Sequence, residues 1–347
     1  MTVHLTHGAK KNVGDYLIHS RARKLWKHVA PEVEIASIAR WIPEELPNDS
    51  RLLVMCGGPG FTPRLVEGVF PVVQRAGEHG IPVSGLALGW QGLPKRNPGS
   101  FTMTARSVAT LRAIAASGSP ISVRDDVTQE IAEQFGIESV RTGCTAWYSI
   151  PDLGSSARIA SAEPRSIVYT TPALDENAAQ SLAVMRMLRT RFPAAKLYAS
   201  FHRGIEADEL TTKPQSKILR RQAKAAKSLG FEVLDVAYDL GRIGFYRDID
   251  LHVGYRVHAH LDFVSRRSPS VLISEDGRGF GQTATLHGRK QVLWSDAQEL
   301  VPKLERRITA EIEKEWPSLT RAIETIEASY PVMRDVIKRQ AQLAAGF

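Results

Sequence analysis

The chain has 347 residues, 43% of them hydrophobic, which is ample for a packed core and favours two domains over one. Its net charge of +8 favours anionic partners, but the basic residues are dispersed and not interleaved with aromatic residues, which argues against nucleic acid. Two cysteines exclude a disulfide framework, and we expect a soluble, cytoplasmic protein because there is no signal-peptide pattern and no apolar run of about 20 residues.

The first half of the chain alternates apolar runs with helical patterns. A strand at 2–5 precedes a polar loop and a helix that begins at Gly14-Asp15 and ends near His28, with Asp15 as the expected N-cap. The run 52–56 is apolar throughout, as in a strand buried on both faces of a parallel sheet. Further strands are expected at 34–38, 81–88 and 120–123, and further helices at 62–79, at 105–116 and from Asp125 or Asp126 to Phe135.

The same alternation restarts after residues 153–165, which are rich in Ser, Ala and Gly and form the predicted linker. The pattern predicts an α/β fold of two Rossmann-like, doubly wound domains facing a cleft, as in GT-B glycosyltransferases. We place an N-terminal domain at 1–155, a C-terminal domain at 165–300 and a helical tail at 301–347. The later strands are expected at 167–169, 196–200, 231–236, 249–253, 270–273 and 291–294, with helices at 175–191 and 214–229.

The tail is charged and helical from about Gln298, with breaks expected at Pro302, Pro317 and Pro331. Its last part carries a stripe of mostly Val, Ile, Met and Ala at helical spacing, with one leucine and no Trp or Phe. Because strong interfacial helices carry larger apolar residues, we predict that this stripe docks on the domains; weak contact with a membrane surface is the alternative. The stripe comprises Val332, Met333, Val336, Ile337, Gln340, Leu343 and Ala344.

The stretch 250–278 carries the strongest chemical signal. Its first strand leads through Gly254 into Arg256-Val257-His258, and its second strand ends in Glu275-Asp276-Gly277-Arg278. Ligands bind at the carboxyl ends of parallel strands. An arginine fork suits a carboxylate or phosphate, and a histidine can move a proton near neutral pH. Taken by themselves, these residues fit a structural role about as well as a functional one. In the structural role the arginine forms an ion pair and the histidine is a hydrogen-bonded core residue.

Three further features have similar double interpretations. Arg124 stands before a helix N-terminus, where anions collect, or else forms an ion pair with Asp125 or Asp126. The stretch Gly57-Gly58-Pro59-Gly60 lines a cleft or is only a tight turn, and no Gly-Lys-Ser/Thr follows it. Asn12, Gly14 and Asp15 contact an acceptor or serve helix capping.

The cysteines and a second histidine are expected to be structural. Cys56 and Cys144 are expected to be buried thiols. His260 shares a face with His258 if the stretch is extended, but two histidines without a third ligand are weak evidence for a metal. We interpret His260 as a packing residue and expect neither a metal nor an organic cofactor.

Together these motifs resemble the polysaccharide pyruvyl transferase family over residues 8 to about 290. The chain departs from the family pattern at Pro59-Gly60-Phe61, where many members have a third glycine after the glycine pair. The matching residues are Asn12-Val13-Gly14-Asp15, Gly57-Gly58, Ser122-Val123-Arg124-Asp125, Asp250, Gly254, Arg256-Val257-His258, Ala259, Pro269 and Asp276-Gly277-Arg278.

The resemblance implies a ketal pyruvyl transferase that moves pyruvyl from phosphoenolpyruvate onto two hydroxyls of a sugar in a surface or exported polysaccharide. The acceptor would be a sugar or a lipid-linked saccharide bound by the N-terminal domain. The alternatives are a nucleotide-sugar-dependent GT-B glycosyltransferase and a catalytically silent sugar-binding protein. The implied roles are acid or base for His258, donor binding for Arg124, Arg256 and Arg278, and acceptor or cleft contacts for Asn12, Gly14, Asp15, Gly57 and Gly58.

Overall fold

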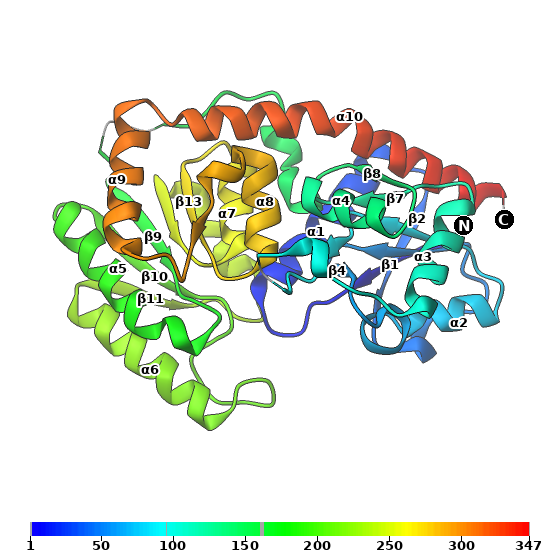
Figure 1. Ribbon diagram of the computed structural model, residues 1–347, viewed down its shortest axis with the longest axis horizontal. Helices are drawn as coiled ribbons and strands as arrows, with labels where there is room; N and C mark the ends of the chain where they lie inside the picture. Colours follow the sequence, from blue (N-terminus) through cyan, green and yellow to red (C-terminus); the bar gives the residue numbers. More distant parts are fainter. Residues whose placement is uncertain (1, 95, 160–162, 347) are drawn as a thin grey trace.

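The computed structural model describes residues 2–94, 96–159 and 163–346 and contains two parallel sheets that lie side by side (Figure 1). The N-terminal sheet has the strand order β2-β1-β3-β5, and two small pairs, β4-β6 and β7-β8, extend this half. The strands of this half are β1 (Thr2–His7), β2 (Glu34–Ala39), β3 (Leu52–Cys56), β4 (Pro59–Phe61), β5 (Val83–Leu86), β6 (Gly89–Trp90), β7 (Ile121–Val123) and β8 (Ser139–Arg141).

The second sheet has six parallel strands in the order β11-β10-β9-β12-β13-β14. The order reverses direction beside β9, and ligand sites of α/β sheets lie at such switch points. The strands are β9 (Ser166–Thr170), β10 (Lys196–Phe201), β11 (Phe231–Asp235), β12 (Leu251–Gly254), β13 (Ser270–Ser274) and β14 (Leu293–Trp294).

Helices connect successive strands and cover the sheets. In the C-terminal half, α5 and α6 lie on the outer side, whereas α7 and α8 lie toward the other half (Figure 1). Two Rossmann-like α/β halves with a helical tail are as predicted. The helices are α1 (Val13–Val29), α2 (Val72–Glu78), α3 (Ala105–Ala116), α4 (Asp126–Gln134), α5 (Ala178–Arg191), α6 (Lys213–Ser228), α7 (Val257–Ser265), α8 (Gly277–His287), α9 (Leu300–Glu313) and α10 (Pro317–Gly346).

Two predicted elements in the first half were wrong in detail. The helix expected over 62–79 is a π-helical segment, Leu65–Val69, followed by α2, because Pro71 offers no N–H and disfavours helical backbone at Phe70. The strand expected over 81–88 is shorter, and β6 forms a separate pair with β4. The expected strands and helices elsewhere agree with the structure to within a few residues.

The connection between the halves runs from residue 153 to residue 165. In the part that the structure describes it contains no helix or strand, in agreement with the predicted linker, and residues 160–162 lie outside the described residues. The predicted domain limits of 155, 165 and 300 remain a prediction.

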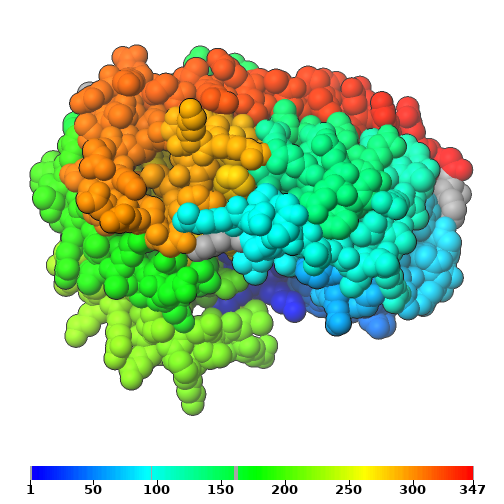
Figure 2. Space-filling view, viewed as in Figure 1, coloured from blue at the N-terminus to red at the C-terminus, as the bar shows by residue number. Residues whose placement is uncertain are grey.

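The tail forms two helices, and α10 crosses from the C-terminal half to the N-terminal half (Figures 1 and 2). It contacts α8, α7, α1 and β3, and Gln340 donates hydrogen bonds to the Ser84 hydroxyl (2.9 Å) and the Gly85 carbonyl (3.2 Å). This end of α10 thus lies against the N-terminal half, and docking of the tail on the domains stays a prediction. Among the described residues, no helix is long and apolar enough to cross a membrane.

The predicted break at Pro331 was wrong, because α10 is continuous through it. Packing on both sides of the proline outweighs the roughly 3 kcal/mol that an interior proline costs. Pro302 interrupts nothing either, since it lies in the first turn of α9, where the N–H has no partner within the helix. Only Pro317 marks a boundary, as the first residue of α10.

Deleting residues 331–347 is expected to lower the melting temperature by roughly 10 °C. Among the buried side chains that the deletion removes are three large apolar ones, Met333, Val336 and Ile337, each worth about 1.5–3 kcal/mol. Thermal unfolding of the truncated chain gives the shift. Binding to anionic vesicles, measured by co-sedimentation, should stay weak with or without the segment. Vesicle binding that disappears on truncation, with unchanged melting, would contradict docking.

A chain of hydrogen-bonded neutral histidines connects β12 and β13 with α7, α8 and α10. Because a carbonyl can only accept, His287 Nδ1 donates to the Ser318 oxygen (2.9 Å), and its Nε2 then accepts from His260 Nε2 (3.0 Å). His260 Nδ1 in turn accepts from the Ser270 hydroxyl (2.7 Å), which accepts from His252 Nδ1 (2.7 Å). The direction of every bond is fixed, so an added proton would break the chain. His260 is thus a packing residue, as predicted.

The free energy of unfolding is expected to fall as the pH drops below about 6.5. Burial lowers the pKa of His252 to about 3, and burial, partly offset by the Ser318 carbonyl, lowers that of His287 to about 4. Between these values and about 6.5 the unfolded chain binds more protons than the folded one, so acid destabilises the fold. Chemical denaturation between pH 7 and pH 5 measures this loss in a window above most carboxylate titrations. A flat profile there would contradict the neutral histidine chain.

Candidate active site

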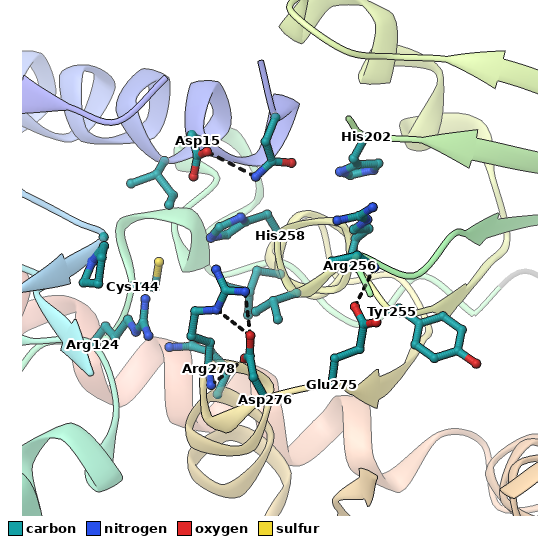
Figure 3. A pocket seen from close by; sticks show the side chains of 18 of the residues that line it. Asp15, Arg124, Cys144, His202, Tyr255, Arg256, His258, Glu275, Asp276 and Arg278 are labelled. Atoms are coloured by element: carbon teal, nitrogen blue, oxygen red, sulfur yellow. Dashed lines mark hydrogen bonds and ion pairs between the residues drawn. The ribbon is translucent and has the colours of Figure 1, made fainter. Parts of the chain in front are cut away.

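The carboxyl ends of both sheets border one pocket between the halves. The surface is hollowed there, and residues near the N-terminus come into view at its base (Figure 2). The pocket holds about 840 Å³ of space, including open solvent at its mouth. The predicted residues among those that line it are Asn12, Asp15, Gly58, Arg124, Arg256, His258 and Arg278 (Figure 3).

Arg256 is the N-cap residue of α7, held where β12 ends. Its side chain is only 8% exposed, and one terminal nitrogen donates to the Pro172 carbonyl (2.8 Å). Its Nε is buried and has no hydrogen-bond partner among the described residues. Burial lowers the pKa of Arg256 to about 10, with Glu275 opposing the change, so the guanidinium is charged at neutral pH. A buried cation with a free N–H is suited to an anionic ligand.

Arg124 follows β7, directly before α4. It lines the pocket, and it also forms the ion pair with Asp125 (3.1 Å) that the sequence offered as the alternative. A second bond joins it to the Trp90 carbonyl (2.7 Å). Asp125 is the N-cap of α4 and accepts from the Thr128 N–H (2.8 Å). The ion pair therefore orients the arginine without removing it from the pocket.

The loop after β13 supplies a third arginine and two carboxylates. Arg278 is exposed to the pocket, and two of its nitrogens contact Asp276 at 2.8 and 2.5 Å. Burial by itself would raise the pKa of Asp276, but the pair with Arg278 lowers it below its ordinary value. Glu275 is buried and accepts from the Ala173 N–H (2.7 Å) and the Asn177 amide (2.8 Å). Both carboxylates thus have partners, Asp276 in Arg278 and Glu275 in the N–H donors of residues 173 and 177.

His258 lies in the centre of the pocket, between Asp15 and Arg278 (Figure 3). Burial and, to a smaller extent, the nearby Arg124 and Arg278 together lower its pKa to about 3. The imidazole is therefore neutral at physiological pH. Its ring packs directly against the backbone of Gly14. A Cβ added to Gly14 would lie only 2.3 Å from the Nδ1 atom of the ring.

Replacing Gly14 by alanine is expected to lower turnover on the order of 10²-fold, because the added methyl displaces the His258 ring. Gly14 is in α1 and has helical backbone, so alanine itself suits the position. Gly77→Ala in α2 is the matched control, since its Cβ position has no described atom within 4 Å apart from its chain neighbours and its own helix backbone. Steady-state kinetics should show the loss in kcat for the first variant only. Normal turnover in Gly14→Ala would show that the ring position is unimportant.

On the N-terminal side, the expected residues divide into two groups. Asn12 and Asp15 line the pocket, and the Asn12 amide donates to Asp15 (3.2 Å). The expected N-cap was wrong: α1 begins at Val13, which places Asn12 at the cap position and Asp15 in the first turn. Gly14 and Gly57 do not line the pocket. Gly14 supports His258, and Gly57 has φ +61° and packs on Ile18.

Several lining residues were not predicted, and two of them, a histidine and an arginine, share one strand end. His202 and Arg203 follow β10 directly, and the rule that ligands bind at carboxyl ends of strands would have included them. His202 is buried, and its Nε2 shares a hydrogen bond with the Tyr246 hydroxyl (2.9 Å). The shared face expected for His258 and His260 was wrong, because both lie in α7. Residues two positions apart in a helix are rotated by about 200° about its axis, so their side chains face nearly opposite sides. Cys56 and Cys144 are buried thiols, as expected.

Comparison with known sequences identifies the family. The sequence model of polysaccharide pyruvyl transferases matches residues 12–261, which is most of the chain. The chain belongs to the polysaccharide pyruvyl transferase family. The match includes Arg124, Arg256 and His258 and confirms the family that the motifs indicated. No individual curated protein sequence matches this pyruvyl transferase family member.

Solved structures share the fold of this family member at low sequence identity. The UDP complex of MnaA from S. aureus has a TM-score of 0.62 at 12% identity, covering 99% of this chain and 97% of that one. A putative UDP-N-acetylglucosamine 2-epimerase from Listeria monocytogenes has a TM-score of 0.60 at 10% identity, covering 97% and 95%. These similarities confirm the GT-B-like fold.

Proposed function

We propose that this protein is a ketal pyruvyl transferase that moves the pyruvyl unit of phosphoenolpyruvate onto two hydroxyls of a saccharide. Family membership supports the reaction class. The observation that carries the proposal is the arrangement of Arg124, Arg256 and Arg278 around a neutral His258 in one pocket. Phosphoenolpyruvate carries a carboxylate and a phosphate on a small carbon frame, and three arginines match that charge.

The donor would bind along the C-terminal half. Arg256 and Arg278 follow two adjacent strands of one sheet, β12 and β13, and Arg124 faces them from the other half. Arg256 supplies a buried N–H without a partner, and Arg278 is exposed to the ligand. We propose that this group holds the carboxylate and phosphate and stabilises the phosphate as it leaves.

The reaction balances with the groups present. Addition of a proton to the methylene carbon gives positive character at the adjacent carbon, where a sugar hydroxyl forms the first C–O bond. The C–O bond to phosphate breaks, and the second hydroxyl closes the ketal. The two hydroxyls release two protons: one replaces the proton added to the methylene carbon, and one leaves with phosphate. His258 is neutral, so we assign it as the base that accepts a hydroxyl proton.

We assign the acceptor to the N-terminal half, where Asn12, Asp15 and Gly58 face the pocket. The acceptor is a sugar or a lipid-linked saccharide for a surface or exported polysaccharide. The reaction would take place in the cytoplasm, where phosphoenolpyruvate is made.

Calorimetry with phosphoenolpyruvate and with a UDP-sugar tests this assignment. We expect phosphoenolpyruvate to bind one to one and the UDP-sugar to bind at least about tenfold more weakly, a difference of about 1.4 kcal/mol. The reverse preference would favour a nucleotide-sugar glycosyltransferase. Binding of neither ligand, in the presence or absence of an acceptor saccharide, would favour a silent sugar-binding protein.

A further inference from the structure

A partly buried arginine lies beside the pocket on its N-terminal side. Arg40 directly follows β2, and its guanidinium is packed against the backbone of Gly8 and Gly58: a Cβ built on these glycines would lie 3.0 Å from Cζ and 2.8 Å from Nη1, respectively. The rings of Phe70 and Trp41 lie 5.5 and 5.9 Å from Cζ. Gly58 itself lines the pocket, so Arg40 borders it directly.

Arg40 differs from the inward-facing arginines Arg21, Arg124 and Arg256 in having neither an ion pair nor a hydrogen bond among the described residues. Within the described part of the chain its side chain forms no hydrogen bond or ion pair, whereas Arg21 pairs with Asp262 (3.0 Å) and Arg124 with Asp125 (3.1 Å). Burial lowers the pKa of Arg40, and only Asp15 opposes this change. Partial burial of an unpaired cation is costly unless a ligand offsets the cost.

Neighbouring groups complete a polar cluster. Lys10 adds a second cation, with Nζ 4.0 Å from the centre of the Trp41 ring. The rings of His7 and His19 lie 4.9 Å apart, and the Nδ1 atom of each is buried without a hydrogen-bond partner among the described residues. Burial lowers both pKa values, that of His19 to about 4, so these rings are neutral groups able to bond hydroxyls.

The cluster adjoins the acceptor side of the pocket. β1 and β2 are parallel and in register to their ends, which places His7 and Arg40 at the same sheet edge. His19 lies one helical turn after Asp15 in α1, so both point to the same side of the helix. Asp15 lines the pocket, and the cluster therefore continues the pocket wall away from the donor arginines.

We propose that Arg40 and Lys10 bind an anionic group of the acceptor, either a phosphate or a carboxylate, while His7 and His19 bond its sugar hydroxyls. This inference rests on the proposed function and adds the chemical class of the acceptor. A phosphate would come from a phosphate-linked saccharide, and a carboxylate from a uronic acid. In either case the anion would lie on the far side of Asp15 from His258.

The test is calorimetry in saturating phosphoenolpyruvate with three matched ligands: methyl glucoside, glucose 1-phosphate and glucuronic acid. We expect at least one anionic ligand to bind about tenfold or more tightly than the neutral glycoside, and the better one identifies the source. Arg40→Ala should remove this advantage and leave the affinity for phosphoenolpyruvate unchanged, and Lys10→Ala should reduce it in part. Arg106→Ala removes the same charge from an exposed arginine in α3 and should change nothing.

Several results would overturn the proposal. These are equal affinity for the three ligands and an anion preference that survives Arg40→Ala. A third is a binding stoichiometry of two phosphoenolpyruvate molecules per wild-type chain that falls to one in Arg40→Ala, which would make the cluster a second phosphoenolpyruvate site. Failure of the proposed function looks different: phosphoenolpyruvate does not bind, yet an Arg40-dependent preference for the anionic sugar remains. Because Lys10 is exposed, its variant tests the site even if Arg40→Ala lowers stability.

Discussion

Replacing His258 by alanine is expected to reduce pyruvyl transfer about 10²–10⁴-fold, the usual contribution of a general base. The ring lies between Asp15 and Arg278 and is kept neutral by burial and by two arginines. Because the loss concerns proton transfer, kcat should fall while the affinity for phosphoenolpyruvate, measured by calorimetry, stays the same or rises slightly.

The control for this variant is His28→Ala, an exposed histidine near the end of α1. It should have wild-type turnover. Both variants should melt within a few degrees of the wild type, because His258 is only half-buried. Turnover close to normal in His258→Ala would exclude the base role, and a large fall in melting temperature would support a core role instead.

Replacing Arg256 by lysine is expected to weaken phosphoenolpyruvate binding about tenfold to a hundredfold. Lysine loses the bidentate fork and the bond to Pro172. It also loses charge, because burial lowers the pKa of Arg256 to about 10, well below its ordinary value. The same burial would lower the pKa of a lysine, which starts from about 10.4, toward neutral pH. The defect should therefore grow as the pH rises from 7 to 9, which calorimetry at several pH values can measure.

Arg124→Ala should weaken donor binding as well, by removing a second cation from the pocket. Arg289→Lys, at an exposed arginine paired with Glu130, is the matched control and should bind normally. Unchanged donor affinity in both pocket variants would place the donor elsewhere. A loss seen only for a UDP-sugar would favour the glycosyltransferase alternative.

The sequence predicted most of the strands and helices because apolar runs such as 52–56 mark buried parallel strands directly. It failed where tertiary packing overrides local signals. Pro331 reads as a helix end, yet contacts on both sides keep α10 continuous across the two halves. Asp15 reads as an N-cap, yet the chain enters the helix one turn earlier, at Asn12.

The candidate site was predictable as far as strand ends could be located. Arg124, Arg256 and Arg278 were found in this way, and His202 was missed at another strand end. The role of Gly14 was not predictable, because it depends on a ring 244 residues later in the chain packing against its backbone. The protonation state of His258 was likewise not accessible, since burial and charges brought in from both halves determine it.

The most direct test of the central claim is phosphate release from phosphoenolpyruvate across a panel of acceptor saccharides, with NMR analysis of the products. The account predicts release that requires an acceptor, one phosphate for each pyruvate ketal formed, and loss of both signals in His258→Ala. Release without ketal formation, or no release with any acceptor while a nucleotide sugar is consumed, would contradict it.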